Sequence, residues 1–135
     1  MKIQSIAKIA TLGALLSVAA MSFAASNSSG FVALPAAKTA TLPHSIMLAY
    51  PFTARIDNNT ANQIAWSAGS SLNWIGADDT QLVANTHTPP PAYADIYLYD
   101  QYGTYITDIQ VPNRACVDVN SPSPSGIYVT DNCLQ

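Results

Sequence analysis

The sequence predicts a small all-β protein, an antiparallel β-sandwich or partly open barrel of about six to eight strands with one disulfide. Of its 135 residues 49% are hydrophobic and only 10% are charged, which is typical of a chain that folds around a core. Every acidic residue is Asp, and Pro, Asn, Ser, Thr and Tyr are frequent, which disfavours long helices. Short alternating segments separated by turn residues recur along the chain, as expected for strands.

Residues 1–24 have the pattern of a signal peptide. Lys2 and Lys8 form a positively charged region that precedes an uncharged apolar stretch over residues 9–21. Ser22-Phe23-Ala24 then offers small residues at the two positions that a signal peptidase reads. The apolar stretch is shorter than the ~20 residues of a membrane-spanning helix, so a transmembrane anchor is disfavoured. We therefore expect cleavage after Ala24, no transmembrane segment in the mature chain, and a periplasmic or secreted location.

Export also predicts a disulfide between Cys116 and Cys133, because the mature chain has an even number of Cys and an oxidising destination. Two independent buried thiols are the alternative. A metal site is disfavoured because His44 and His87 are both distant in sequence from the Cys pair, and two thiolates do not complete a tetrahedral shell. If the two Cys face each other across antiparallel strands, the connection is centred in residues 121–126, which are rich in Ser and Pro.

Along the chain, residues 25–44 are predicted to be an extended arm or linker, and residues 45–135 a single β domain with order beginning near Ser45. The first strand is expected over 46–57, with Phe52, Ala54 and Ile56 toward the core. Two short strands follow, and they are expected to turn an apolar and aromatic face to the core: 63–67 with Ile64 and Trp66, and 71–75 with Leu72 and Trp74.

The next segments are less regular. Asp78 is suited to cap a helical turn that runs to Leu82, although 80–83 equally fits a strand. Residues 85–92 contain three consecutive Pro and predict a polyproline-like crossover.

Residues 93–111 predict a β-hairpin, because two alternating runs flank Asp100-Gln-Tyr-Gly103, which fits a type I turn. Opposing Asp100 with Gly103 gives one apolar face, whereas a slip of one residue moves polar side chains into the core. The inward residues are then Ile96, Leu98, Tyr105, Thr107, Ile109 and Val111, and the outward residues are Asp95, Tyr97, Tyr99, Thr104, Ile106 and Asp108.

In this register Asp95 and Asp108 are direct cross-strand partners, an arrangement that is destabilising for like charges. Three things are able to relieve the repulsion: solvent, a nearby Arg55 or Arg114, or a bound Ca²⁺ ion. A metal site formed by Asp95 and Asp108 is the least favoured of these, since the sequence has no D-x-D-x-D-G calcium loop.

The same face carries Tyr97 and Tyr99 side by side. Exposed rings beside carboxylates suit the binding of sugars or of protein side chains, so Tyr97, Tyr99, Asp95 and Asp108 are the ligand-binding candidates. The alternative is that a long connection, 26–43 or 85–92, covers the two tyrosines.

No catalytic residue is predicted. The chain lacks a G-x-S-x-G elbow and any Glu, and an Asp95–Asp108 pair lies too close for the carboxylate separations of glycosidases. The mature chain has three basic residues and eight Asp, a net charge of −5, which argues against nucleic acid and anionic lipid as partners. We expect an exported, non-catalytic module that has no cofactor and binds a sugar or a protein surface, with a bound Ca²⁺ ion as the least favoured alternative. The alternatives are a small metal-dependent hydrolase and a structural component of the cell envelope.

Overall fold

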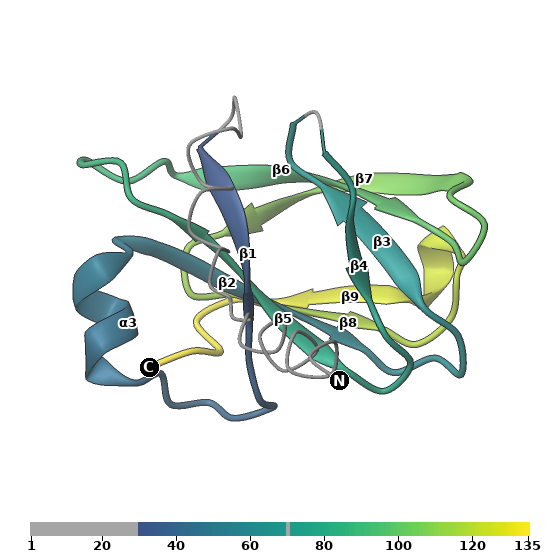
Figure 1. Ribbon diagram of the computed structural model, residues 1–135, viewed down its shortest axis with the longest axis horizontal. Helices are drawn as coiled ribbons and strands as arrows, with labels where there is room; N and C mark the ends of the chain where they lie inside the picture. Colours follow the sequence, from purple (N-terminus) through teal and green to yellow (C-terminus); the bar gives the residue numbers. More distant parts are fainter. Residues whose placement is uncertain (1–29, 70) are drawn as a thin grey trace, which may run out of the picture.

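The computed structural model describes residues 30–69 and 71–135, which form two β-sheets packed face to face (Figure 1). One sheet has five strands in the order β1-β5-β2-β8-β9, and the other has four in the order β4-β3-β6-β7. These nine strands and the disulfide described below confirm the prediction of a small, largely antiparallel all-β fold with one disulfide. The predicted signal peptide, 1–24, and its cleavage site at Ala24 lie outside the described residues.

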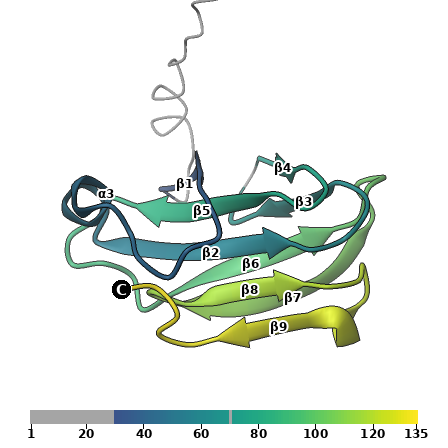
Figure 2. The ribbon, with the colours of Figure 1, turned by 90° about the horizontal axis from the view of Figure 1, so that it is seen from below.

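The elements in chain order are β1 (Phe31–Pro35), α3 (His44–Ala49), β2 (Phe52–Asn58), β3 (Ile64–Ser67), β4 (Asn73–Ile75), β5 (Thr80–Asn85), β6 (Tyr93–Tyr99), β7 (Tyr105–Pro112), β8 (Cys116–Val119), η1 (Pro124–Gly126) and β9 (Ile127–Thr130). Figure 2 shows β5, β2, β8 and β9 running side by side in the five-stranded sheet. Within the described residues, no helix has the length and apolar character needed to span a membrane.

Strand β1 lies ahead of Ser45, near which order was expected to begin. Within the segment predicted as an arm, β1 pairs antiparallel with β5, which pairs on its other side with β2. The ring of Phe31 packs edge-on against that of Phe52, with centroids 5.3 Å apart. This apolar anchor explains why the segment joins the sheet as an edge strand.

The prediction of a strand over 46–57 was right from Phe52 onward and wrong before it. Phe52, Ala54 and Ile56 are buried between the sheets as expected, but residues 44–49 form helix α3. The cause is a second, smaller cluster on the outer side of the five-stranded sheet. Half-buried Ile46 and Met47 pack on that cluster, whose buried members are Leu42, Leu82, Cys116 and Leu134.

Cys116 and Cys133 form the predicted disulfide, with Cα atoms 5.6 Å apart. The strand register inferred from it was wrong, because Cys116 lies opposite Thr130 rather than Cys133. β9 ends at Thr130, and a turn with Asn132 at a φ of +54° brings Cys133 back to Cys116. The connection between β8 and β9 does span residues 121–126, and it contains η1.

The prediction for Trp66 was right, because its side chain is fully buried in the main core and its Nε1 donates a hydrogen bond to Gln81 Oε1 at 2.9 Å. The predictions for Trp74 and Leu72 were wrong, since both are exposed and Ile75 points inward instead. The segment after Asp78, left open between a helical turn and a strand, is strand β5.

Candidate functional site

The candidate site lies on the hairpin of β6 and β7, where the turn adds one residue to the expected register. Gly103 N–H donates to Asp100 O at 3.0 Å, which closes the predicted turn, but Asp100 N–H donates to Thr104 O at 2.9 Å. Gly103 has a φ of +81°, a conformation that glycine adopts without steric cost. Asp100 therefore faces Thr104 rather than Gly103, as in a type I turn followed by a glycine bulge.

A second irregularity follows directly. Tyr99 pairs with Tyr105 but Leu98 pairs with Thr107, so Ile106 is the extra residue of a β-bulge. The turn and the bulge together shift the pairing by two residues. A shift of two returns each side chain to its original face, so the expected inward positions of Ile96, Leu98, Ile109 and Val111 are confirmed, with Ile109 only partly buried.

The same shift overturns the expected Asp95–Asp108 pair. Asp95 lies opposite Gln110, and Asp108 lies opposite Tyr97. Gln110 Nε2 donates a hydrogen bond to Asp95 Oδ1 at 3.1 Å, and the hydroxyl of Tyr105 donates one to Asp108 Oδ1. Each carboxylate thus has its own neutral donor, and the direct repulsion inferred from the sequence does not arise.

Arginine, one of the three alternatives for relieving the repulsion, has other partners. Arg55 forms an ion pair of 2.9 Å with Asp57, and Arg114 donates to Thr53 Oγ1 at 3.2 Å. Within the part of the chain that the structure describes, no three His, Cys, Asp or Glu side chains gather as potential metal ligands. The Ca²⁺ hypothesis rested on the direct opposition of Asp95 and Asp108, which the register removes.

Aromatic side chains line up across the outer face of the four-stranded sheet. Pairing places Trp74 of β4 beside Ala65 of β3, Ala65 beside Tyr99 of β6, and Tyr99 beside Tyr105 of β7. Ala65 has no exposed surface, and the rings of Tyr99 and Tyr105 meet edge-on with centroids 6.1 Å apart. One row of cross-strand neighbours therefore carries three aromatic rings. Tyr97, two residues from Tyr99, starts the next row.

We call this surface the aromatic–carboxylate patch and define it as Trp74, Asp95, Tyr97, Tyr99, Tyr105 and Asp108. Trp74 and Tyr97 are each 41% exposed and Tyr105 is 52% exposed, while Tyr99 is half-buried beside Tyr105. The alternative that a long connection covers Tyr97 is therefore wrong. All four candidates named from the sequence share this outer face. Trp74 and Tyr105 join them, although the sequence pattern placed both in the core.

Within the patch, the pKa of Tyr105 is raised above its ordinary value of 10.0. The main cause is the hydrogen bond to Asp108, which holds the phenol proton. Desolvation and the charge of Asp108 act in the same direction, with smaller contributions from Tyr97 and Tyr99. Because a neighbouring anion disfavours a phenolate, Tyr105 acts here as a hydrogen-bond donor that orients the carboxylate.

The charged side chains on the strands of the four-stranded sheet are of one sign. These strands carry Asp95 and Asp108 and neither Lys nor Arg. In the described residues Lys38, Arg55 and Arg114 are the basic side chains, and none of them lies in the four-stranded sheet. The patch thus combines aromatic rings with negatively charged side chains only.

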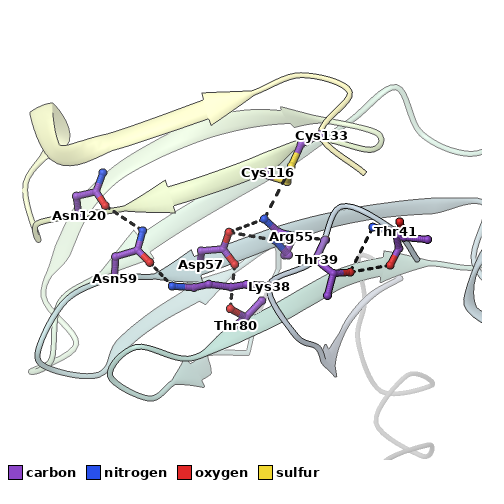
Figure 3. A network of polar contacts seen from close by, with 10 residues as sticks. All are labelled: Lys38, Thr39, Thr41, Arg55, Asp57, Asn59, Thr80, Cys116, Asn120 and Cys133. Atoms are coloured by element: carbon purple, nitrogen blue, oxygen red, sulfur yellow. Dashed lines mark hydrogen bonds and ion pairs between the residues drawn. A yellow bond between two sulfur atoms is a disulfide. The ribbon is translucent and has the colours of Figure 1, made fainter. Parts of the chain in front are cut away.

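A second polar cluster lies on the five-stranded sheet, under the segment that leads to α3 (Figure 3). Arg55 and Asp57 are almost buried there, and Asp57 Oδ1 also accepts a hydrogen bond from Thr80 Oγ1 at 2.9 Å. Arg55 also donates to Thr39 O and approaches Cys133 Sγ at 3.9 Å. These mutually satisfied groups join the sheet to its covering segments, which is a structural role.

Comparisons of the chain with protein-family models, with curated proteins and with solved structures found no match. The functional argument therefore rests on the patch. Its rings offer flat apolar surfaces, and its carboxylates accept hydrogen bonds or pair with cations.

Proposed function

We propose that the protein is an exported, non-catalytic binding module and that the aromatic–carboxylate patch is its binding surface. The observation that carries the proposal is the row of Trp74, Tyr99 and Tyr105 across all four strands of one sheet, with Tyr97 and two carboxylates beside it. The leader pattern and the disulfide support export.

Two physical properties make this surface suited to binding. The rings are carried by paired strands, so little conformational entropy is lost when a ligand packs on them. Large apolar areas are exposed to water on Trp74, Tyr97 and Tyr105, and none of these three side chains belongs to the main core. Such a cluster is typical of an interaction site on a sugar or on another protein.

We propose binding in preference to metal-dependent hydrolysis. The metal site considered for a hydrolase was the pair of Asp95 and Asp108, and these two residues have different cross-strand partners. No observation favours catalysis over binding at this surface.

The test uses the purified mature protein on a glycan array and on a peptide array. We compare wild type with the double variant Tyr97→Ala/Tyr105→Ala and with a control, Tyr128→Ala, whose ring is 56% exposed on β9 of the other sheet. We expect wild type and Tyr128→Ala to be retained on the same array positions and the double variant to lose them. Absence of retention on both arrays, or equal retention of all three proteins, would overturn the proposal.

A further inference from the structure

We infer that the ligand of the aromatic–carboxylate patch is a basic segment of another protein, whose Arg or Lys side chains lie on the tyrosine rings between the two carboxylates. This inference rests on the proposed function and specifies its ligand. Three independent features of the surface carry it.

The first feature is the sign of the charge. The strands of the four-stranded sheet carry the carboxylates of Asp95 and Asp108 and contain neither Lys nor Arg. A cationic partner is attracted to such a face from a distance and an anionic one is repelled, which disfavours nucleic acids and anionic membranes. A neutral sugar gains nothing from this asymmetry.

The second feature is the contact between ring and carboxylate. Tyr97 is the direct cross-strand neighbour of Asp108, a position at which Cβ atoms are about 4.5–5.5 Å apart. Asp95 precedes Tyr97 by two residues on the same face, about 7 Å along the strand. A guanidinium or ammonium group placed over the Tyr97 ring therefore has a carboxylate within reach on two sides, which combines a cation–π contact with ion pairing.

The third feature is the set of hydrogen bonds that hold the carboxylates. The hydroxyl of Tyr105 donates a hydrogen bond to Oδ1 of Asp108, and Nε2 of Gln110 donates one to Oδ1 of Asp95. In the described structure the Oδ2 atom of each carboxylate accepts no hydrogen bond. Each carboxylate is thus oriented by one donor and keeps one oxygen for a ligand. The forked N–H groups of Arg match this requirement better than a single metal ion, which makes no use of the rings.

The probe is an acetylated and amidated hexa-arginine peptide, compared with the hexa-citrulline peptide, which keeps the shape and removes the charge. We measure binding by calorimetry and by amide chemical shifts of the intact mature protein. We expect hexa-arginine to bind at least about tenfold more tightly than hexa-citrulline, and its affinity to fall about tenfold between 20 and 200 mM salt, because salt screens exposed charges. The largest shifts should occur at Tyr97 and Asp108.

Variants separate a site from general charge attraction. Tyr97→Ala and Asp108→Asn should each lower the affinity about tenfold, while Tyr97→Phe, which keeps the ring, should bind like wild type. Asp131→Asn is the matched control, since it removes the same charge from an exposed position after β9. Amide spectra that match wild type outside the patch show that each variant is folded.

Each result decides between the two proposals. Equal losses of hexa-arginine affinity in Asp108→Asn and Asp131→Asn would overturn the inference that the ligand is a basic segment. Equal binding of the hexa-arginine and hexa-citrulline peptides would overturn it as well. Binding of a neutral glycan at the patch without binding of hexa-arginine would overturn the inference and leave the proposed function standing. If neither arrays nor peptides bind, both proposals fail.

Discussion

Removing the Cys116–Cys133 disulfide should lower the free energy of unfolding by about 3 kcal/mol. The bridge joins residues 17 apart in the sequence, and cross-linking a loop of that size restricts the unfolded chain by roughly this amount in the chain-entropy model. The variant is Cys116→Ala/Cys133→Ser, which avoids leaving a lone thiol in the buried site. The assay is equilibrium unfolding in urea, compared with the oxidised wild type.

A second contribution to the lost free energy of unfolding depends on the residues after Cys133. Leu134 is buried in the outer cluster, its N–H donates to Arg114 O at 2.9 Å, and Gln135 N–H donates to Ala40 O at 2.7 Å. If these contacts persist without the bridge, the loss stays near 3 kcal/mol. If the tail detaches, the burial of Leu134 is lost as well, which adds about 1.5–3 kcal/mol.

The variant Leu134→Ala in both backgrounds distinguishes the two cases. A docked tail gives the same cost for Leu134→Ala with and without the disulfide, whereas a detached tail gives no cost once the bridge is gone. A loss below about 1 kcal/mol for the disulfide-free protein would refute the reasoning, because it would mean that the bridge does not restrict the unfolded chain.

Three further predictions concern the hairpin and the N-terminus. Ile96→Ala should cost about 2–5 kcal/mol in urea unfolding because its side chain is fully buried, and Tyr97→Ala should cost less than half as much; equal losses would mean that both faces of the hairpin are covered. Asp108→Asn should return the pKa of Tyr105 toward its ordinary value, as measured from the NMR signals of the tyrosine rings. Because that pKa is raised in the folded state, the interaction of the protonated Tyr105 with Asp108 stabilises the fold below pH ~10, and this stabilisation is lost as the pH rises above the folded pKa. At higher pH, wild type should therefore lose more stability than Asp108→Asn. Intact mass of the native protein, before and after reduction, should correspond to a chain that begins at Ala25 and has one disulfide, and a retained leader would contradict this.

The sequence was sufficient to predict most of the inward and outward positions of the hairpin but not its register. Alternation of apolar and polar residues identified Ile96 and Leu98 as inward and Tyr97 as outward, because side-chain direction has a period of two. The pairing itself depends on where single residues are inserted. Gly103 at the end of the turn is a signal for one insertion, but no residue type marks the bulge at Ile106, so Tyr105 was placed on the wrong face.

Burial of both sides of one sheet was the other feature that local patterns did not reveal. The alternation in β2 correctly separated Ile56 from Arg55 and Asp57, but it gave no sign that the polar side is also covered. That cover comes from the segment that leads to α3, which lies close to β2 in sequence, and from the residues around Cys133 and Leu134, which are far from β2 in sequence. Trp74 shows the converse case, because an aromatic residue that suits a core was left exposed by the pairing of β4 with β3.

The parallel alignment of β2 with β8 has a consequence for the order of folding. In the five-stranded sheet, this pair joins the strands of residues 31–85 to those of residues 116–130. The chain forms β6 and β7 of the other sheet after β2 and before β8. Such a long-range contact forms slowly, since the entropy of closing the intervening chain is lost before the contact gives stability. A growing chain that has not reached residue 116 cannot complete this sheet. We therefore expect the polypeptide to stay unfolded until its last strands have been made, which agrees with the export proposed above, since an exported chain crosses the membrane before it folds.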